Sequence, residues 1–102
     1  MTRRVLWSND ALDDLLEQIA HIAADNPGAA ERVARRLREV GTALGTYATG
    51  HPGRVSGTYE KSVPRLPYVI VYALTDGDGA VSILRVIHAA RDWGGEEWPE
   101  SS

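Results

Sequence analysis

The amino-acid sequence predicts a single α+β domain, in which an N-terminal strand and an antiparallel helical hairpin pack on a twisted antiparallel β-sheet. Two amphipathic segments follow each other at residues 10–24 and 27–44, and β-rich runs occupy most of the chain after Gly53. Helices and strands that are segregated in this way are typical of α+β folds. At 102 residues the chain is long enough to bury one hydrophobic core and too short for two.

A short apolar stretch from Val5 to Trp7 predicts the first strand. It ends at Ser8-Asn9-Asp10, residue types whose side-chain oxygens cap helices. In the helix that follows, acidic residues are concentrated in the first turns, where the helix dipole favours anions. Apolar residues recur there every three or four positions, which predicts one buried face: Leu12, Leu15, Leu16, Ile19, Ile22 and Ala23.

The string Asp25-Asn26-Pro27-Gly28 ends the first helix and starts a second one. Asn26 is placed to cap it, and Pro27 stands at the first helical position, where its missing amide hydrogen costs little. Two helices joined by so short a link are expected to form an antiparallel hairpin. The second apolar stripe contains small residues that allow close packing: Ala30, Val33, Ala34, Leu37, Val40, Gly41 and Leu44.

The pattern changes after the second helix. Residues 45–53 are expected to form a loop because they contain several glycines, a proline and hydroxyl side chains. A moderately polar strand is predicted over residues 54–63, and Pro64-Arg65-Leu66-Pro67 interrupts the chain after it. The run from Tyr68 to Leu74 is rich in β-branched and aromatic residues, which predicts a central strand.

Two Asp-Gly pairs within residues 75–79 predict a hairpin turn, because this dipeptide adopts the backbone conformation that tight hairpins require. The run from Val81 to His88 then returns as another buried strand. The last three strands are therefore expected to form an antiparallel meander.

The composition limits the cellular context. The chain contains no cysteine, so neither a disulfide framework nor a thiolate metal site is available, and the cytoplasm is the expected compartment. The basic start leads into only three apolar residues, which differs from a signal peptide. No apolar run has membrane-spanning length, so no membrane association is expected.

The net charge of −3 is unevenly distributed. Four of the 14 acidic residues lie within residues 92–102, so the remaining ten nearly balance the 11 basic ones. Proteins that bind nucleic acid through phosphate contacts usually have a clear basic excess. We therefore expect no sequence-specific DNA binding by this chain alone, and we interpret the basic residues of the second helix as a solvated face: Arg32, Arg35, Arg36 and Arg38.

Four strings resemble the ParE toxins in their order and spacing: Asp25-Asn26-Pro27 with Ala29 and Ala30, Gly57 to Glu60, Val63 to Tyr72, and Ile83 to Arg91. Each string alone is a weak signal, but together they extend over roughly residues 5–93. The resemblance implies a helical hairpin on a twisted antiparallel sheet, in agreement with the periodicities. We expect residues 1–92 to form the toxin domain and the acidic residues 93–102 to form a flexible tail.

The resemblance also implies a toxin of a type II toxin–antitoxin pair, a class associated with growth arrest and plasmid maintenance. The expected partner is a ParD-like antitoxin in a hetero-oligomer, which lays an amphipathic helix and an extended segment across the toxin. ParE-like members inhibit DNA gyrase, whereas RelE-like members cut mRNA on the ribosome. A shared fold does not distinguish these activities, because chemistry belongs to the site.

Our first hypothesis is a gyrase-binding toxin that needs no cofactor, metal or catalytic residue. In that case the residues expected to contact the target or the antitoxin are Arg65, His88, Arg91 and Trp93. The second hypothesis is a ribosome-dependent endoribonuclease, which requires a base, an acid and fixed cations. The residues that supply this set are Glu60, Arg65, His88 and Arg91. The third is an inactive regulatory member that only binds its antitoxin.

Several of these residues have structural alternatives. Arg65 precedes one predicted strand and His88 ends its neighbour, so both are expected at one end of the sheet. His88 also suits a hydrogen bond to the backbone, and Arg65 suits an ion pair with Glu60. Trp7, Tyr68 and Tyr72 are expected in the core. Trp93 and Trp98 either hold the tail on the sheet or form exposed anchors for a partner.

Departures from the RelE pattern favour the gyrase hypothesis. RelE-like nucleases are typically rich in lysine and arginine and often carry an aromatic hydroxyl after the last strand. Lys61 is the only lysine here, and the string Ala89-Ala90-Arg91-Asp92-Trp93 contains no tyrosine. A nearly neutral domain is poorly suited to ribosomal RNA, since attraction to phosphates requires a basic surface.

Overall fold

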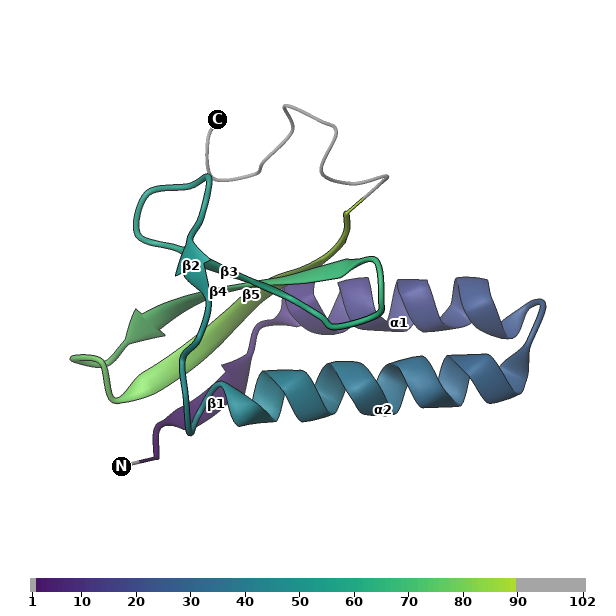
Figure 1. Ribbon diagram of the computed structural model, residues 1–102, viewed down its shortest axis with the longest axis horizontal. Helices are drawn as coiled ribbons and strands as arrows, with labels where there is room; N and C mark the ends of the chain where they lie inside the picture. Colours follow the sequence, from purple (N-terminus) through teal and green to yellow (C-terminus); the bar gives the residue numbers. More distant parts are fainter. Residues whose placement is uncertain (1, 90–102) are drawn as a thin grey trace.

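The computed structural model describes residues 2–89 and confirms the α+β fold, with a strand, a helical hairpin and a sheet (Figure 1). The strands lie in the order β1-β5-β4-β3-β2. In Figure 1 the α1–α2 link and the β4–β5 turn lie at opposite ends of the molecule. The elements are β1 (Arg4–Trp7), α1 (Asn9–Ala23), α2 (Pro27–Ala43), β2 (His51–Pro52), β3 (Tyr59–Ser62), β4 (Tyr68–Thr75) and β5 (Ala80–His88).

The sheet is mixed, whereas the sequence predicted an antiparallel one. β1 runs parallel to β5, with Arg4 opposite Ala80 and Trp7 opposite Ile83. The pairs β5–β4, β4–β3 and β3–β2 are antiparallel, as expected of the meander. The ladder continues beyond β1, because the Ser8 amide donates to the Ile83 carbonyl at 2.9 Å. Apolar periodicity reports which face of a strand is buried and carries no information on strand direction, so the parallel pair was missed.

α1 begins at Asn9, inside the predicted capping string, because the Ser8 hydroxyl accepts a hydrogen bond from the Ala11 amide at 3.0 Å. The helix buries Ala11 and Leu15 against the sheet. Two members of the predicted stripe are exposed instead: Leu12 shows 42% and Leu16 66% of its surface. The predicted buried face was therefore too wide, since α2 and the sheet cover only one side of α1.

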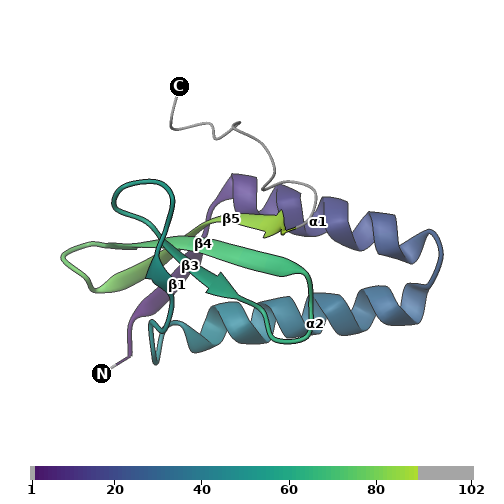
Figure 2. The same ribbon diagram turned by 45° about the horizontal axis from the view of Figure 1, so that its top comes forward.

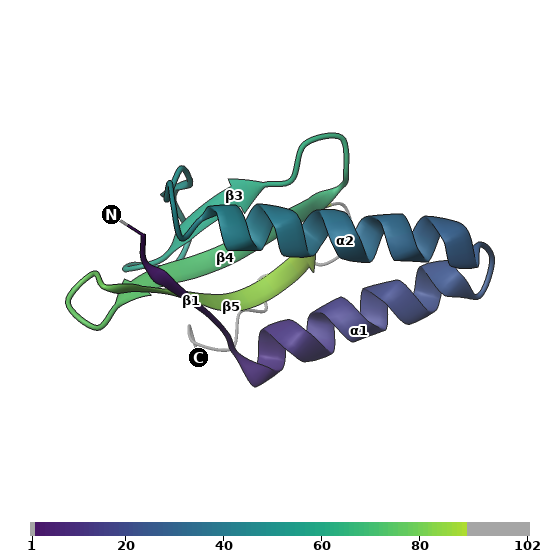
Figure 3. The same ribbon diagram turned by 90° about the horizontal axis from the view of Figure 1, so that it is seen from below.

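α2 begins at Pro27, and the Asn26 carboxamide oxygen caps it by accepting from the Ala29 amide at 3.0 Å. Both helices lie on the same side of the strands, as Figure 3 shows. Close packing depends on Gly41, where an added Cβ would lie 2.6 Å from Cζ2 of Trp7. The half-buried Trp7 packs against the core, as predicted. No helix within residues 2–89 is long and apolar enough to cross a membrane.

The segment between α2 and β4 differs from the prediction in two places. The loop expected at residues 45–53 contains the two-residue strand β2. The strand expected at residues 54–63 is shorter and covers only Tyr59–Ser62. The amide of Gly53 donates to the Thr58 carbonyl and that of Thr58 to the Val55 carbonyl, which closes a loop over residues 53–58. Gly57 supplies the positive φ of 85° within this loop.

β4 is the central strand, as predicted, and its two faces contribute to different clusters. Tyr68, Ile70 and Tyr72 belong to the main core beneath the helices. Val69 and Val71 join Ile87 in a smaller cluster. The Asp-Gly hairpin is also confirmed, with positive φ at Asp76, Gly77 and Asp78, so β5 returns directly alongside β4.

The Tyr72 hydroxyl is a polar group inside the core. Tyr72 has no exposed surface, and its hydroxyl oxygen accepts a hydrogen bond from the Gly50 amide at 2.8 Å. Burial raises the pKa of this phenol above its usual value of 10, because the phenolate would lose its hydration. The same hydrogen bond ties the loop before β2 to the central strand.

Candidate functional site

A pocket of about 520 Å³ opens between α2 and the turn that joins β3 to β4. Figure 2 shows this turn lying against α2. The walls of the pocket are largely aliphatic, and three arginines belong to its lining. The lining residues are Ala29, Arg32, Val33 and Arg36 from α2 and Pro64, Arg65 and Leu66 from the turn.

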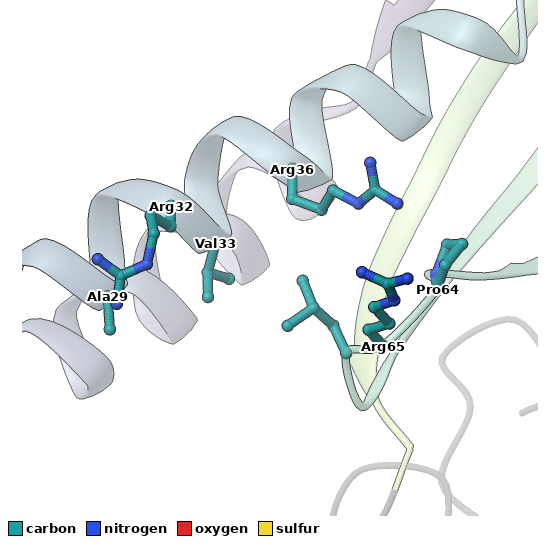
Figure 4. A pocket seen from close by; sticks show the side chains of 7 residues that line it. Ala29, Arg32, Val33, Arg36, Pro64 and Arg65 are labelled. Carbon is teal, nitrogen blue, oxygen red and sulfur yellow. The ribbon is translucent and has the colours of Figure 1, made fainter.

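The guanidinium groups come from both sides of this pocket. In Figure 4, Arg36 extends from α2 toward Pro64, and Arg65 extends from the turn toward α2. Arg32 lies further along α2, beside Ala29. Three arginines therefore line an opening whose walls are made of Ala29, Val33 and other aliphatic groups.

The turn that holds Arg65 has the features of a type II turn. The Leu66 amide donates to the Val63 carbonyl at 3.2 Å, Pro64 is the second residue, and Arg65 is the third, with a φ of 67°. Glycine or asparagine is favoured at the third position, because a Cβ is disfavoured at positive φ. An arginine there costs on the order of 1 kcal/mol. The backbone is thus held in a strained conformation at a residue that lines the pocket.

Little internal negative charge opposes these arginines within residues 2–89. No salt bridge of 4.0 Å or less joins Arg32 or Arg65 to a carboxylate in that range. Arg36 lies 3.9 Å from the Glu39 carboxylate, but both side chains are about half exposed, and such pairs contribute little. The first turn of α2 also contains no acidic residue, so its positive dipole end is not offset there.

Arg65 and His88 lie at the same end of the sheet, as expected from the sequence. His88 pairs with Tyr68 at the start of β4, and the next amide, that of Ala89, donates to the Pro67 carbonyl at 2.8 Å. The His88 ring is half-buried and meets the Tyr68 ring edge-on, with 5.4 Å between centroids. The imidazole therefore packs against the aromatic ring at the start of β4.

Glu60 lies apart from His88. It pairs with Val71 across β3 and β4, whereas His88 pairs with Tyr68. Directly opposed residues point to the same face of a sheet, and positions 68 and 71 of one strand point to opposite faces. The two side chains therefore lie on opposite faces.

The Glu60 carboxylate is also engaged in the structure. Glu60 is only 8% exposed, and its Oε2 accepts from the Arg54 amide at 2.9 Å. The alternative ion pair between Glu60 and Arg65 is not present. Through this hydrogen bond, Glu60 helps to hold the loop before β3 closed.

Two of the predicted site residues, Arg91 and Trp93, lie outside the described residues, as do Trp98 and the rest of the predicted tail, residues 93–102. Within residues 2–89, no three His, Asp or Glu side chains gather as metal ligands.

Arg32 and Arg36 are functional candidates that the residue pattern did not indicate, since the pattern predicts a solvated helix face there. Both are exposed, but they also line the pocket together with Ala29 and Val33. The available signal was their spacing, because residues four apart share a helix face. The sequence does not reveal that the Pro64–Leu66 turn packs over that face, and this packing converts a solvated surface into a pocket.

Comparison with known proteins identifies the family. The model of the ParE toxin of the type II toxin–antitoxin system parDE matches residues 5–93. The candidate toxin Y4kP of Sinorhizobium fredii is 39% identical over 92 residues, which cover 89% of this chain and 93% of that protein. Toxin RelE2 of Caulobacter vibrioides is 38% identical over 89 residues, which cover 86% of this chain and 97% of that protein.

Two solved structures have the same fold. A chain of the chromosomal ParDE system from P. aeruginosa superposes with a TM-score of 0.78 at 21% identity, over 85% of this chain and 96% of the other. A chain of the RelBE2 toxin–antitoxin complex of Mycobacterium tuberculosis superposes with a TM-score of 0.61 at 25% identity, over 86% and 92%. The family model covers nearly the whole chain, and this protein therefore belongs to the ParE toxin family of type II toxin–antitoxin systems.

Proposed function

We propose that this toxin acts in the cytoplasm by binding and inhibiting DNA gyrase, and that a ParD-like antitoxin neutralises it in a hetero-oligomer. The observation that carries this proposal is the position of Glu60 and His88 on opposite faces of the sheet. A catalytic acid and base must reach the same phosphate within hydrogen-bonding distance. Separation across a sheet argues against that chemistry and favours a toxin that acts through surface contacts.

The charge distribution supports the same choice. Outside residues 92–102 the ten acidic residues nearly balance the 11 basic ones, and Lys61 is the only lysine. Affinity for an RNA backbone grows with the number of phosphates that basic side chains neutralise. A nearly neutral domain fits a protein target better than ribosomal RNA.

The ribosome-dependent nuclease remains the second candidate function. One relative, 38% identical to this chain, bears the name RelE2, and a solved neighbour is a RelBE2 complex. Arg65 and His88 also lie at one end of the sheet. In that alternative the catalytic set is Glu60, Arg65, His88 and Arg91. In the gyrase proposal Arg65, His88, Arg91 and Trp93 contact the target or the antitoxin, and no cofactor or metal takes part.

An antitoxin partner is supported by the surface of the helical hairpin. Leu12 and Leu16 lie four residues apart on α1 and are 42% and 66% exposed, so they present an apolar strip on one side of the helix. Exposed apolar strips of this kind suit the apolar face of a partner helix. The solved RelBE2 neighbour is itself a toxin–antitoxin complex.

The proposal is tested by inducing the chain alone in a bacterial host and measuring chromosome breakage and messenger RNA decay in parallel. We expect filamentation, a DNA damage response and cleaved DNA, and purified toxin should inhibit plasmid supercoiling by purified gyrase. Co-expression of the ParD-like antitoxin should restore growth. Rapid loss of translated mRNA with intact chromosomes would assign the chain to the nuclease class. Normal growth at confirmed soluble expression would indicate a regulatory member.

Substitution of His88 separates the two mechanisms in the same assays. His88→Gln keeps a hydrogen-bonding side chain but cannot transfer a proton at neutral pH. We expect this variant to retain most of its toxicity, because no proton transfer is needed to bind gyrase. If the toxin is a nuclease, His88→Ala should lower cleavage by about 100-fold or more. Loss of toxicity in a folded His88→Gln variant that still binds antitoxin would contradict the gyrase proposal.

A further inference from the structure

The pocket between α2 and the β3–β4 turn combines two properties that suit one class of ligand. Its walls are aliphatic, from Ala29, Val33, Pro64 and Leu66, so they accept apolar side chains. Its three arginines favour carboxylates, which the planar guanidinium binds in a bidentate manner. A ligand that satisfies both must be apolar in its centre and acidic at its edges.

We propose that this pocket is the docking site for an acidic amphipathic segment of the antitoxin. An apolar side chain of that segment would enter between Val33 and Leu66, and its carboxylates would bind Arg32, Arg36 and Arg65. This inference rests on the proposed antitoxin partnership and adds to it a defined surface and a defined chemistry. It also explains why α2 has arginines at two positions that flank an apolar wall.

The strained backbone at Arg65 supports a ligand-binding task for its side chain. Glycine would relieve the positive φ of 67°, yet the sequence has arginine there. The side chain forms no ion pair within residues 2–89 that would account for it. It extends toward α2 and the opening of the pocket (Figure 4). The turn therefore holds a guanidinium at the edge of the pocket, where a partner carboxylate meets it.

Nucleic acid is the main competing ligand for an arginine cluster, and the lining of the pocket argues against it. Proteins that bind single strands usually offer aromatic rings on which bases stack. None of the seven lining residues is aromatic. Aliphatic walls match the side chains of a peptide and find no counterpart on a phosphate backbone, so a peptide carboxylate is the favoured partner.

The test uses the full chain and the antitoxin that restores growth in the co-expression assay. The pocket variant carries Arg32→Glu with Arg36→Glu, and the matched control carries Arg35→Glu with Arg38→Glu. Both change the charge of α2 equally, but Arg35 and Arg38 do not line this pocket. We expect the pocket variant to weaken antitoxin binding at least about tenfold by calorimetry and the control less than about threefold, because opposed charges lower affinity only where contacts form.

Two further variants keep the result independent of misfolding. Arg65→Gly removes the guanidinium while relieving the strained backbone, and we expect weaker binding without a lower melting temperature. Ala29→Leu fills the pocket with a residue that favours helices, and it should weaken binding without changing charge. The affinity of the wild-type chain should fall when NaCl is raised from about 0.1 M to 0.5 M, and that of the pocket variant should fall less.

Each alternative outcome has its own interpretation. Equal losses in the pocket and control variants, or no loss in either, would overturn the inference while leaving the antitoxin partnership intact. Failure of the wild-type chain to bind any ParD-like protein would instead overturn the proposed function. Arginine-dependent binding of a 30-nucleotide RNA or a 30-base-pair DNA duplex would replace the peptide by nucleic acid. Loss of gyrase inhibition with unchanged antitoxin affinity would assign the pocket to the target.

Discussion

Arg85, within β5, and Arg65, in the turn before β4, differ in their ionic partners. Arg85 on β5 donates from Nε at 2.7 Å and from Nη2 at 3.0 Å to the carboxylate of Asp14 on α1. Its side chain is 26% exposed and that of Asp14 is 13% exposed, so the pair is largely shielded from water. Arg65, on the turn before β4, is exposed and forms no ion pair within residues 2–89.

The Arg85–Asp14 pair stabilises the fold, whereas the exposed guanidinium of Arg65 is accessible to a binding partner. Asp14 also accepts from the Val86 amide at 2.9 Å, so one carboxylate joins α1 to the edge of β5. In contrast, no ion pair within residues 2–89 offsets the strained backbone at Arg65. The two helices show the same contrast at their N-termini, since α1 begins with Asp10 in its first turn and α2 has no acidic residue there.

The largest expected effect is on the internal charge pair. Asp14→Ala leaves the partly buried Arg85 without its carboxylate and the Val86 amide without an acceptor, and it should lower the free energy of unfolding by about 3 kcal/mol. In a domain of this size that corresponds to a decrease in melting temperature of roughly 15 °C. Asp13→Ala, the same change on the exposed side of α1, is the matched control. Equal melting temperatures for the two variants would contradict a structural role for the pair.

A smaller effect is expected at the buried Tyr72 hydroxyl. Tyr72→Phe leaves the Gly50 amide without its acceptor, at a cost of about 1 to 2 kcal/mol. Tyr59→Phe is the control. Tyr59 stacks on Tyr72 with 5.5 Å between the ring centroids, and the substitution removes a hydroxyl while keeping this stack. Denaturant unfolding of both variants at neutral pH measures the difference. Similar losses in both variants would contradict a specific stabilising role for the Tyr72 hydroxyl, because both substitutions keep the ring.

The raised pKa of Tyr72 also predicts a pH dependence. Between the unfolded value near 10 and the higher folded value, the folded chain binds more protons than the unfolded chain, so stability decreases as pH rises. The contribution is complete below pH 10 and is lost as the pH passes through the folded pKa. Melting temperatures from pH 8 to pH 11 should therefore fall more steeply for the wild-type chain than for Tyr72→Phe. Parallel curves would contradict this assignment.

At Arg65 the expected change in stability has the opposite sign. Arg65→Gly should leave the free energy of unfolding unchanged or raise it by up to about 1 kcal/mol, because relief of the positive φ is partly offset by the greater freedom of glycine in the unfolded chain. Arg65→Ala removes the same guanidinium and keeps the strain, so it should be the less stable of the two. If Arg65→Gly is strongly destabilising, the side chain has a structural contact after all.

The smallest effect is expected at Arg4, whose ion pair with Asp76 has side chains that are 64% and 69% exposed. Water screens such a pair, so Arg4→Ala should change stability by less than about 0.5 kcal/mol. A loss of stability as large as that of Asp14→Ala would show that the surface ion pair contributes as much as the internal one.

Much of the fold followed from local chemistry. Ser8 and Asn26 cap the two helices as their residue types suggest, and the Asp-Gly turn connects β4 and β5 as expected. What could not be predicted depends on contacts between distant segments. The direction of β1 was missed for this reason, and so was the exposure of Leu12 and Leu16.

The candidate site was predicted only in part for the same reason. The placement of Arg65 and His88 at one sheet end followed from the strand order. Glu60 lies on the other face because its register with Val71 is set by pairing, which no residue pattern of the sequence specified. The Arg32 and Arg36 side chains became part of a pocket only through the turn that packs over α2. Tertiary packing, rather than residue type, determines which basic side chains line the pocket.

The parallel pairing of β1 with β5 has a consequence for how this protein is made. The Ser8 hydroxyl donates to the Leu84 carbonyl, a contact that joins residues 76 positions apart, and β5 lies between β1 and β4 in the sheet. During synthesis the helical hairpin leaves the ribosome long before β5, the strand that joins β1 to β4. Contacts of such high sequence separation form late because a long loop must close first. The toxin is therefore expected to remain unfolded, and harmless, until translation has passed His88.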